Sequence, residues 1–341
     1  MDNKVKIGIL GCADIAKRYA IKAFQSIDNC EVVSIASRDP VKAKEWALDF
    51  NIQAEESYDS LLNNKDIDAV YIPLPVGLHK EWTLKAVATG KHIICEKSLA
   101  GDFESAKKMV DACRVGGVVL YENFMSDLHP QHEKIMSLIK SGDIGKIFVF
   151  RGFFGFPPLN KDNIRYDKKL GGGCLNDAGA HIIFMARKIF GQEPISVACN
   201  LIEDEKLGVD IQGTAMLEFP DERVALVAFS FCSAYQNNYS VWGSEAVINV
   251  KQAYSIGPEM KPVIEIVKTK NYEEISTIID APIANQFEMI FHDFCDTILR
   301  QKNRSEKINN TYSRILDQAK VLEAMRRSSQ EKRMVKIEEI K

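Results

Sequence analysis

Short apolar runs alternate with helical patterns along the first 120 residues. Runs such as Val5–Leu10 contain few polar positions, which is typical of parallel strands buried on both faces. Strands are expected at Val5–Leu10, Val32–Ala36, Ala69–Pro73, His92–Glu96 and Val118–Glu122, and helices at Ala13–Ser26, Pro40–Phe50, His79–Thr89 and Phe103–Cys113. This alternation predicts an α/β domain with a doubly wound parallel sheet and helices on both of its faces.

After about residue 145 the apolar runs lengthen and follow one another directly. Strands are expected at Lys146–Phe156, Ile195–Ile202, Ile211–Phe219, Val224–Tyr235, Tyr239–Val250 and Val263–Thr269, and helices at Gln131–Ser141, Cys174–Phe190, Gln286–Gln301 and Thr311–Ser328. Long strands joined by turns such as Pro220–Glu222 predict an α+β domain with an antiparallel sheet. The boundary is expected near Phe124–Pro130, which gives domains of residues 1–123 and 124–341.

One strand, Val224–Cys232, is apolar or small at both sets of alternating positions. A strand with one face in water would carry polar residues at every second position. We expect helices on one face of this sheet and a second copy of the chain on the other, since monomers rarely expose large apolar patches. This predicts a homodimer or homotetramer through the C-terminal sheet; the alternative is that both faces are covered within the chain.

The composition of the 341-residue chain narrows the choice of partners. Lys and Arg number 44 against 47 Asp and Glu, so the net charge of −3 argues against a nucleic-acid partner. No run of 18 apolar residues occurs and the N-terminus lacks a secretory pattern, so we expect no membrane partner and a cytoplasmic location. The eight cysteines lack C-x-x-C spacing, and the histidines lack ligand spacing, so reduced thiols and no metal are expected.

The first strand leads into a glycine-containing turn that is suited to phosphate. In the dinucleotide pattern G-x-G-x-x-G/A, the three positions are Gly11, Ala13 and Ala16. Gly11 permits the tight turn, Ala13 crowds the approach of a pyrophosphate, and Ala16 allows close helix packing. The residues expected at the phosphates are Gly11, Cys12, Ala13, Asp14 and Ile15. The alternative is a tight turn that binds no ligand.

The second strand ends at Ser37-Arg38-Asp39, where many NAD sites place an acidic residue. A hydroxyl and a guanidinium suit a 2′-phosphate, and Asp39 before Pro40 favours a helix start. We therefore expect NADP, with NAD as the alternative; Arg38 could instead be a solvated surface residue.

Polar residues also follow the third and fourth strands, at the edge where parallel sheets bind ligands. A lysine at such an edge can transfer a proton, although a solvated lysine is the ordinary alternative. The residues expected to face the cofactor here are Pro73, Leu74, His79, Glu96 and Lys97.

In the second domain, three glycines precede Cys174-Leu175-Asn176-Asp177. On a helix, Asp177 and His181 share one face at i and i+4. A carboxylate beside an imidazole orients it and raises its pKa, so an acid/base pair is one interpretation. A helix-stabilising pair is the other.

Five segments together resemble the glucose–fructose oxidoreductase, inositol dehydrogenase and MocA-like oxidoreductases. They are GILGCADIA at 8–16, YIPLPVGLHKEW at 71–82, GKHIICEKSLA at 90–100, HPQHEKI at 129–135 and LGGGCLNDAGAH at 170–181. The resemblance implies an NAD(P)-binding Rossmann domain and a C-terminal substrate and oligomerisation domain with an open, mostly antiparallel sheet. It also implies hydride transfer between the nicotinamide and a carbinol or carbonyl carbon of a sugar or sugar derivative. These segments are most similar to those of the branch that contains sugar dehydrogenases and nucleotide-sugar 3-ketoreductases.

The resemblance also implies roles for individual residues. Lys97 matches the lysine of the family's E-K-P motif, which donates or accepts the proton, and Asp177 matches the carboxylate after the glycine run. His181 stands where the sugar branch has Tyr and the inositol dehydrogenase branch has His. The substrate-binding residues implied are Lys97, Arg165, Tyr166, Asn176, Asp177 and His181.

Three positions depart from the family pattern, and they keep other functions open. Ser98 replaces the motif's proline, Ala13 replaces the central glycine, and the segment Phe124–Asp127 stands where many relatives have an arginine near the substrate. The expected enzyme is an NAD(P)-dependent oxidoreductase acting on CH–OH groups of a sugar derivative. Whether this sugar is linked to a nucleotide is left open by the sequence. The alternatives are a dehydrogenase of a free aldose, polyol or dihydrodiol, a catalytically inactive NADP-binding regulator, and a scaffold without cofactor.

Overall fold

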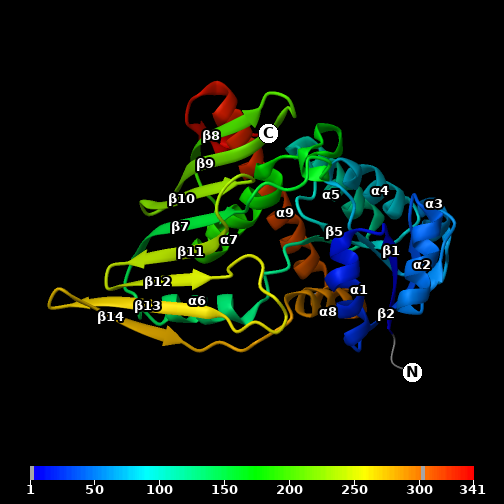
Figure 1. Ribbon diagram of the computed structural model, residues 1–341, viewed down its shortest axis with the longest axis horizontal. Helices are drawn as coiled ribbons and strands as arrows, with labels where there is room; N and C mark the ends of the chain where they lie inside the picture. The colour runs from blue at the N-terminus through cyan, green and yellow to red at the C-terminus, as the bar shows by residue number, and fades with distance from the viewer. Residues whose placement is uncertain (1–3, 301–303) are drawn as a thin grey trace. The chain divides into compact units, whose positions relative to one another are not determined.

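The computed structural model describes residues 4–300 and 304–341, which form two compact units (Figure 1). The described residues up to Asn123, together with those of Phe287–Ala319, make the first unit. Phe124–Gln286 and Lys320–Lys341 make the second unit. The first stretch of the first unit thus ends at Asn123, and the division into domains of residues 1–123 and 124–341 stays a prediction. Phe287–Ala319 returns to the first unit, which a linear division of the chain could not express.

The first unit is built on a parallel sheet of six strands in the order β3-β2-β1-β4-β5-β6. The strands are β1 (Val5–Leu10), β2 (Cys30–Ala36), β3 (Gln53–Ala54), β4 (Ala69–Ile72), β5 (His92–Glu96) and β6 (Leu120–Asn123). The helices are α1 (Ile21–Ser26), α2 (Pro40–Phe50), α3 (Tyr58–Asn63), α4 (Val76–Ala88), α5 (Phe103–Gly116), α8 (Gln286–Leu299) and α9 (Arg304–Glu331). The strand order reverses between β1 and β4, which is where doubly wound sheets bind their ligands.

Both faces of this sheet are covered, which explains why its strands are apolar throughout. All four residues of β4 are buried. Tyr71 packs edge-on against Phe24 of α1 and Phe291 of α8. Val70 and Ile72 belong to a core that includes residues of α3, α4, α5 and α9. The prediction of a doubly wound parallel sheet is thus confirmed for this unit.

The second unit is a sheet of nine strands in the order β14-β13-β12-β11-β7-β10-β9-β8-β15. The strands are β7 (Ile147–Gly155), β8 (Ser196–Asp204), β9 (Val209–Phe219), β10 (Arg223–Ser230), β11 (Gln236–Gly243), β12 (Ala246–Lys251), β13 (Val263–Lys270), β14 (Glu273–Ile279) and β15 (Val335–Lys336). Its helices are α6 (Pro130–Lys140), α7 (Ala180–Phe190) and the part of α9 from Lys320 onward. Its pairings are antiparallel apart from β7 with β10, so the sheet is mixed and mostly antiparallel.

Several predicted elements of the second unit need correction. The strand predicted at Tyr239–Val250 is a hairpin of β11 and β12, in which Trp242 pairs with Val247. Because the apolar pattern continues through the turn between β11 and β12, the sequence pattern did not indicate this turn. Strand β14 was not predicted, because most of its positions are exposed. Gln301, the predicted end of the Gln286–Gln301 helix, and residues 1–3 of the predicted first domain lie outside the described residues.

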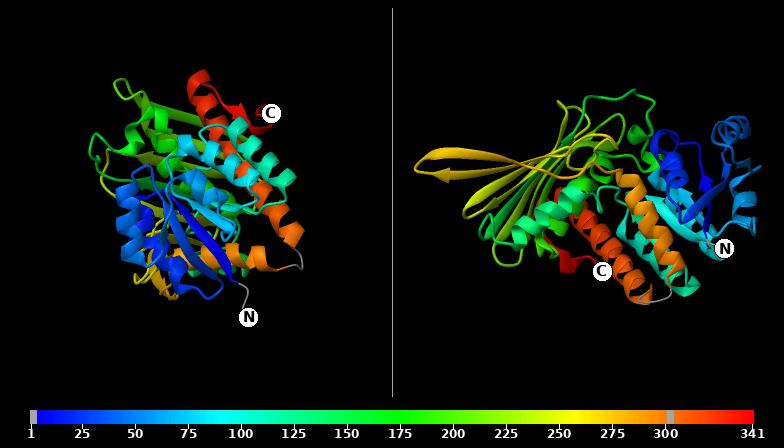
Figure 2. Two further views of the ribbon diagram at one scale, coloured as in Figure 1. Left: turned by 90° about the vertical axis from the view of Figure 1, so that its right-hand side faces the viewer. Right: turned by 90° about the horizontal axis from the view of Figure 1, so that it is seen from below.

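Strand β10 has the two apolar faces that the sequence predicted. Ala225, Val227 and Phe229 are almost fully buried on the side that carries α7. On the opposite side Leu226 is 43% exposed. In Figure 2 the helices of this unit gather on one side of the strands.

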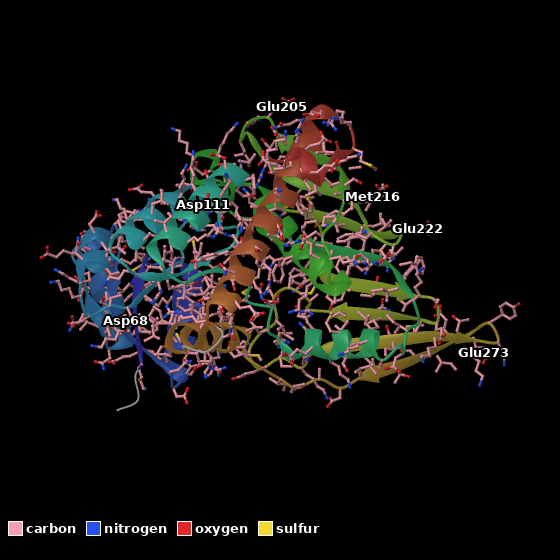
Figure 3. The ribbon with its side chains drawn as sticks, turned by 180° about the vertical axis from the view of Figure 1, so that it is seen from behind. Asp68, Asp111, Glu205, Met216, Glu222 and Glu273 are labelled. Carbon is pink, nitrogen blue, oxygen red and sulfur yellow. The ribbon has the colours of Figure 1, made fainter. Side chains whose placement is uncertain are left out.

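Strands β13 and β14 form a long hairpin with an exposed edge. Figure 3 shows Glu273 beside the tip of this hairpin. At the opposite end of the sheet, the short β15 pairs with only the start of β8. Beyond it, Ser328 and Ser329 of α9 accept hydrogen bonds from the backbone N–H groups of Cys199 and Leu201 in β8, which protects the rest of this edge.

Candidate active site

The chain turns sharply at Gly11, immediately after β1. Gly11 has a φ of +123°, and a Cβ at this position would lie 2.8 Å from Leu74 Cδ2, so only glycine fits. Ala16 is fully buried at the start of a π-helical segment, Ala16–Ala20, which leads directly into α1. The first N–H groups of a helix lack partners within the helix, and its dipole favours an anion there. The turn therefore fits a pyrophosphate, and its expected ligands Cys12, Ala13, Asp14 and Ile15 remain predictions.

The end of β2 presents a hydroxyl and a guanidinium rather than a carboxylate. Asp39 Oδ1 accepts hydrogen bonds from the N–H groups of Val41 at 3.0 Å and Lys42 at 3.2 Å, so this carboxylate caps α2. Ser37 is buried with its Oγ 3.1 Å from the N–H of Asp39, while Arg38 is exposed. These residues fit a 2′-phosphate, because a guanidinium binds phosphate through charge-assisted hydrogen bonds.

Lys42 is a residue of this region that the sequence reasoning missed. Its ammonium donates a hydrogen bond to the carbonyl oxygen of Cys12 at 2.9 Å and lies 5.1 Å from the ring centroid of Trp46. It therefore adds a positive charge beside the turn at Gly11–Ala13, which we call the phosphate turn because of its predicted ligand. The sequence signal that could have indicated Lys42 is its place in the first turn of α2, shortly after Arg38.

The carboxyl end of β5 carries Glu96 and Lys97. The Glu96 carboxylate accepts hydrogen bonds at 2.7 Å from both the Tyr71 hydroxyl and the Asn123 amide. Burial raises the pKa of Glu96. Lys97 is half-buried, and the Lys97–Ser98 peptide is cis. The bonds of Glu96 join neighbouring strands, so its contact with a cofactor remains a prediction, as does that of Lys97.

The His79 ring is enclosed by protein backbone in the first turn of α4. It is fully buried, and its two nitrogens lie against backbone carbonyl oxygens, among them Leu74 O at 2.6 Å from Nε2. The ring thus contacts the protein backbone on both sides, and its contact with a cofactor remains a prediction. Pro73, which is buried, and Leu74 form the backbone between β4 and α4, and their cofactor contacts remain predictions.

In the second unit, the glycine run brings Asp177 and Arg165 together. Arg165 Nε donates a hydrogen bond to Asp177 Oδ2 at 2.6 Å, and the charge of Asp177 raises the pKa of Arg165 further. Tyr166 accepts a hydrogen bond from the N–H of Leu159 at 3.0 Å. The sequence did not predict the ion pair between Arg165 and Asp177, which only the fold reveals. The substrate contacts of these side chains remain predictions.

The side chains of His181 and Asn176 are buried in the second unit. The His181 ring lies edge-on to Phe124 and Phe154, with ring centroids 5.7 Å and 5.4 Å apart. Asn176 Oδ1 accepts a hydrogen bond from Arg326 at 2.5 Å. Residues Leu175–Gly179 form a π-helical turn before α7, so Asp177 and His181 do not have the ordinary i, i+4 relation of an α-helix. The aromatic neighbours of His181 gave no sequence signal, because they come from β7 and from the start of the unit.

Within residues 4–300 and 304–341, no three His, Cys, Asp or Glu side chains are placed to hold a metal ion. No helix in these ranges has the length and hydrophobicity needed to cross a membrane.

Comparison with known proteins places the chain in a family. Residues 5–124 match the "Oxidoreductase family, NAD-binding Rossmann fold", and residues 132–249 match the "GFO/IDH/MocA C-terminal domain". These two matches cover more than half of the chain. The chain is therefore an oxidoreductase with a Rossmann domain, and it belongs to the Gfo/Idh/MocA family. This confirms the resemblance found in the five sequence segments.

Three similar proteins show what this family includes. A dTDP-3,4-didehydro-2,6-dideoxy-alpha-D-glucose 3-reductase of Saccharopolyspora spinosa is 37% identical over 277 residues, which cover 81% of this chain and 83% of that protein. A D-xylose 1-dehydrogenase (NADP(+)) of Haloferax volcanii is 34% identical over 253 residues, or 74% and 77% of the two chains. The crystal structure of a 3-ketoreductase from Actinomadura kijaniata, in complex with NADP and TDP-benzene, has a TM-score of 0.88 and 32% identity, covering 96% of this chain and 98% of that chain.

Proposed function

We propose that this chain is an NADP-dependent reductase of a ketone on a deoxysugar that is linked to a nucleoside diphosphate. The observation that carries the proposal is the likeness, over 96% of the chain, to a 3-ketoreductase crystallised with NADP and a TDP compound. The likeness to a dTDP-sugar 3-reductase supports the same substrate class.

The choice of NADP is supported by the end of β2. Asp39 is engaged at the N-terminus of α2, so it does not offer a carboxylate to a ribose 2′-hydroxyl. Arg38 is exposed and Lys42 lies against the Cys12 carbonyl, so two cations stand near this strand end and the phosphate turn. Both charges favour a 2′-phosphate.

The proposed chemistry assigns each polar residue a separate task. Bound NADPH supplies the hydride that adds to the carbonyl carbon. Lys97 donates the proton that the former carbonyl oxygen gains, and its positive charge stabilises the developing alkoxide. His181 shares this proton transfer, and Asp177, held by Arg165, bonds a substrate hydroxyl or orients the imidazole. In the oxidative direction the same groups accept the proton.

A dehydrogenase of a free aldose is the second candidate, favoured by the 34% identity to a D-xylose 1-dehydrogenase. A single assay separates the two functions. We expect NADPH oxidation with a dTDP-linked 3-ketosugar, and no NADP reduction with D-xylose. Turnover of D-xylose alone would replace the first candidate with the second. Tight NADPH binding without turnover of either substrate would favour a regulatory protein.

The first measurement is a fluorescence titration of the protein with NADPH and with NADH. We expect NADPH to bind more tightly, and Arg38→Ala to weaken NADPH binding by roughly tenfold or more while leaving NADH binding unchanged. Arg114→Ala is the matched control, because this arginine pairs with Asp111 on the surface of α5. Tighter binding of NADH to the unaltered protein would overturn the assignment of Ser37 and Arg38.

We also propose that the helix-free face of the second unit's sheet binds a second copy of the chain. Leu226 is 43% exposed and Trp242 is 39% exposed on strands of this sheet. The register places Leu226 opposite Arg151 of β7, and the Arg151 guanidinium lies 5.8 Å from the Trp242 ring centroid. Large apolar side chains interleaved with arginine are typical of protein–protein interfaces.

A further inference from the structure

The loop after β5 carries Lys97, and its backbone is held by two side chains from other elements. His79 of α4 places Nδ1 3.0 Å from the carbonyl oxygen of Ser98 and 3.2 Å from that of Leu99. Glu122 of β6 accepts a hydrogen bond from the N–H of Leu99 at 2.7 Å. The two residues that follow Lys97 are therefore bonded through their backbone on two sides.

His79 connects this loop to the loop that follows β4. Its Nε2 lies 2.6 Å from the carbonyl oxygen of Leu74, and the ring is fully buried. A carbonyl oxygen can only accept, and a neutral imidazole carries one N–H, so the tautomer decides which of the two ring nitrogens donates. The ring thus links the backbone at Leu74, beside the phosphate turn, to the backbone at Ser98 and Leu99.

Two other histidines, the buried His132 and the half-buried His92, have different surroundings. His92 Nδ1 accepts a hydrogen bond from the N–H of Val119, and His132 has the Tyr239 hydroxyl 2.9 Å from its Nδ1. Each of these rings has a donor beside one nitrogen. The carbonyl groups around His79 belong instead to the two loops that border the cofactor side of the sheet.

The sequence explains why this loop needs support from outside. The segment Glu96-Lys97-Ser98 has serine where the family's motif has proline. Proline fixes its own φ, whereas serine leaves the backbone free. Hydrogen bonds from His79 and Glu122 restrict the same peptides by another means.

We propose that His79 and Glu122 are positioning residues that hold the backbone of Lys97, and through it the ammonium group, in place for proton transfer. The proposal rests on the proposed function, in which Lys97 donates the proton. Neither residue touches the reacting atoms; each acts through the Lys97–Leu99 backbone. A displacement of about 1 Å in a reacting group can lower a rate by about 10²-fold.

The test compares Glu122→Ala, Glu122→Gln and His79→Gln with the matched control His92→Gln. His92 is a half-buried histidine of the same unit, and it accepts a hydrogen bond from Val119, just before β6. Two quantities are measured in each protein: hydrogen exchange of the Leu99 amide, and kcat with KM for NADPH. The exchange measurement does not depend on any substrate.

We expect Glu122→Ala and His79→Gln to speed Leu99 amide exchange and to lower kcat by roughly tenfold or more, with KM for NADPH within about threefold. Glutamine at 122 keeps an oxygen acceptor, so Glu122→Gln restores most of both quantities. His92→Gln leaves both unchanged. If His79→Gln fails to fold, the Ala and Gln variants of Glu122 carry the same comparison.

Two results would overturn the proposal. Unchanged Leu99 exchange in Glu122→Ala would show that the carboxylate does not hold the loop. Faster exchange with an unchanged kcat would show that the loop's position does not matter for proton transfer. A protein that turns over no substrate at all overturns the proposed function instead, and the exchange comparison then still decides whether the two side chains hold the loop.

Discussion

At the scale of single residues, the two units hold their polar side chains by different means. In the first unit, Glu96 is fixed by Tyr71 and Asn123, directly before Lys97. In the second unit, Asp177 is fixed by Arg165, and His181 is enclosed by aromatic rings. Fixed side chains of this kind lower the cost of ordering a site when substrate binds.

Replacing Lys97 tests the proposed proton donor. In Lys97→Met the stem remains and the ammonium is lost, so kcat is expected to fall by about 10²–10⁴-fold. NADPH affinity, measured by fluorescence titration, should change only a few-fold. Lys80→Met is the control, since the Lys80 ammonium bonds Ser105 on the neighbouring helix. A kcat close to that of the unaltered protein would remove Lys97 from the mechanism.

Buried histidines predict a loss of stability in acid. Burial is the main cause that lowers the pKa of His132 to about 3, while an unfolded histidine titrates near about 6.5. The unfolded chain therefore binds more protons below pH 6.5, so the free energy of unfolding decreases as pH falls from there toward 3.

Urea unfolding at pH 7.5 and pH 5.0 measures this contribution. His132 accounts for about 2 kcal/mol of the expected difference between the two pH values. His132→Gln should reduce the difference by about that amount, because glutamine does not titrate. The same pH difference in both proteins would contradict the assignment of His132 as a buried neutral group.

At the scale of elements, the start of the helical segment before α7 depends on a contact with β9. Asp210 accepts a hydrogen bond from the N–H of Leu175 at 2.6 Å, in the way that an N-terminal cap does. Gly173 has a φ of +130°, and a Cβ there would lie 2.4 Å from Asp210 Oδ1. The glycine run therefore allows a strand residue to cap the segment that carries Asp177 and His181.

Gly173→Ala should disturb this cap. The strained φ and the contact with Asp210 together are expected to lower the free energy of unfolding by about 1–3 kcal/mol and to raise KM for the sugar substrate. Gly191→Ala is the matched control, because Gly191 also has a positive φ but has nothing within 4 Å of its added Cβ. Equal effects of the two substitutions on KM would show that the Asp210 contact has no part in the site.

At the scale of the whole molecule, the chain leaves the first unit after Asn123 and returns to it at Phe287. Helix α9 belongs to the first unit up to Ala319 and to the second from Lys320. The two units are therefore connected three times by the chain. The large sheet of the second unit also keeps an exposed apolar face, which is the basis of the proposed self-association.

Leu226→Glu tests this association. A carboxylate in the middle of an apolar interface is costly to bury, so the variant is expected to be a monomer when the unaltered protein is a dimer or tetramer. The measurement is molar mass by light scattering after size-exclusion chromatography. Leu48→Glu is the control, since Leu48 is 84% exposed on α2 in the first unit. A monomeric unaltered protein at micromolar concentration would contradict the proposal.

The sequence by itself determined the local features of this protein. The bounds of β1, β5 and α2 follow from its apolar runs and from Asp39 before Pro40, because these signals act over a few residues. The parallel first sheet, the tight turn at Gly11 and the family followed from the same kind of pattern. The expectation that β10 is apolar on both faces was also local, since strand periodicity is read from neighbouring positions.

Only the tertiary structure decided how distant segments meet. Three hydrogen bonds of the site region join residues that are 12, 35 and 23 positions apart, and no hydrophobic periodicity in the sequence indicates them. They are Arg165 with Asp177, Asp210 with Leu175, and Glu122 with Leu99. The return of Phe287–Ala319 to the first unit and the enclosure of His79 by carbonyl groups are likewise set by packing. Side chains that are held by distant backbone have no local signature, because their positions depend on the energy of the whole fold.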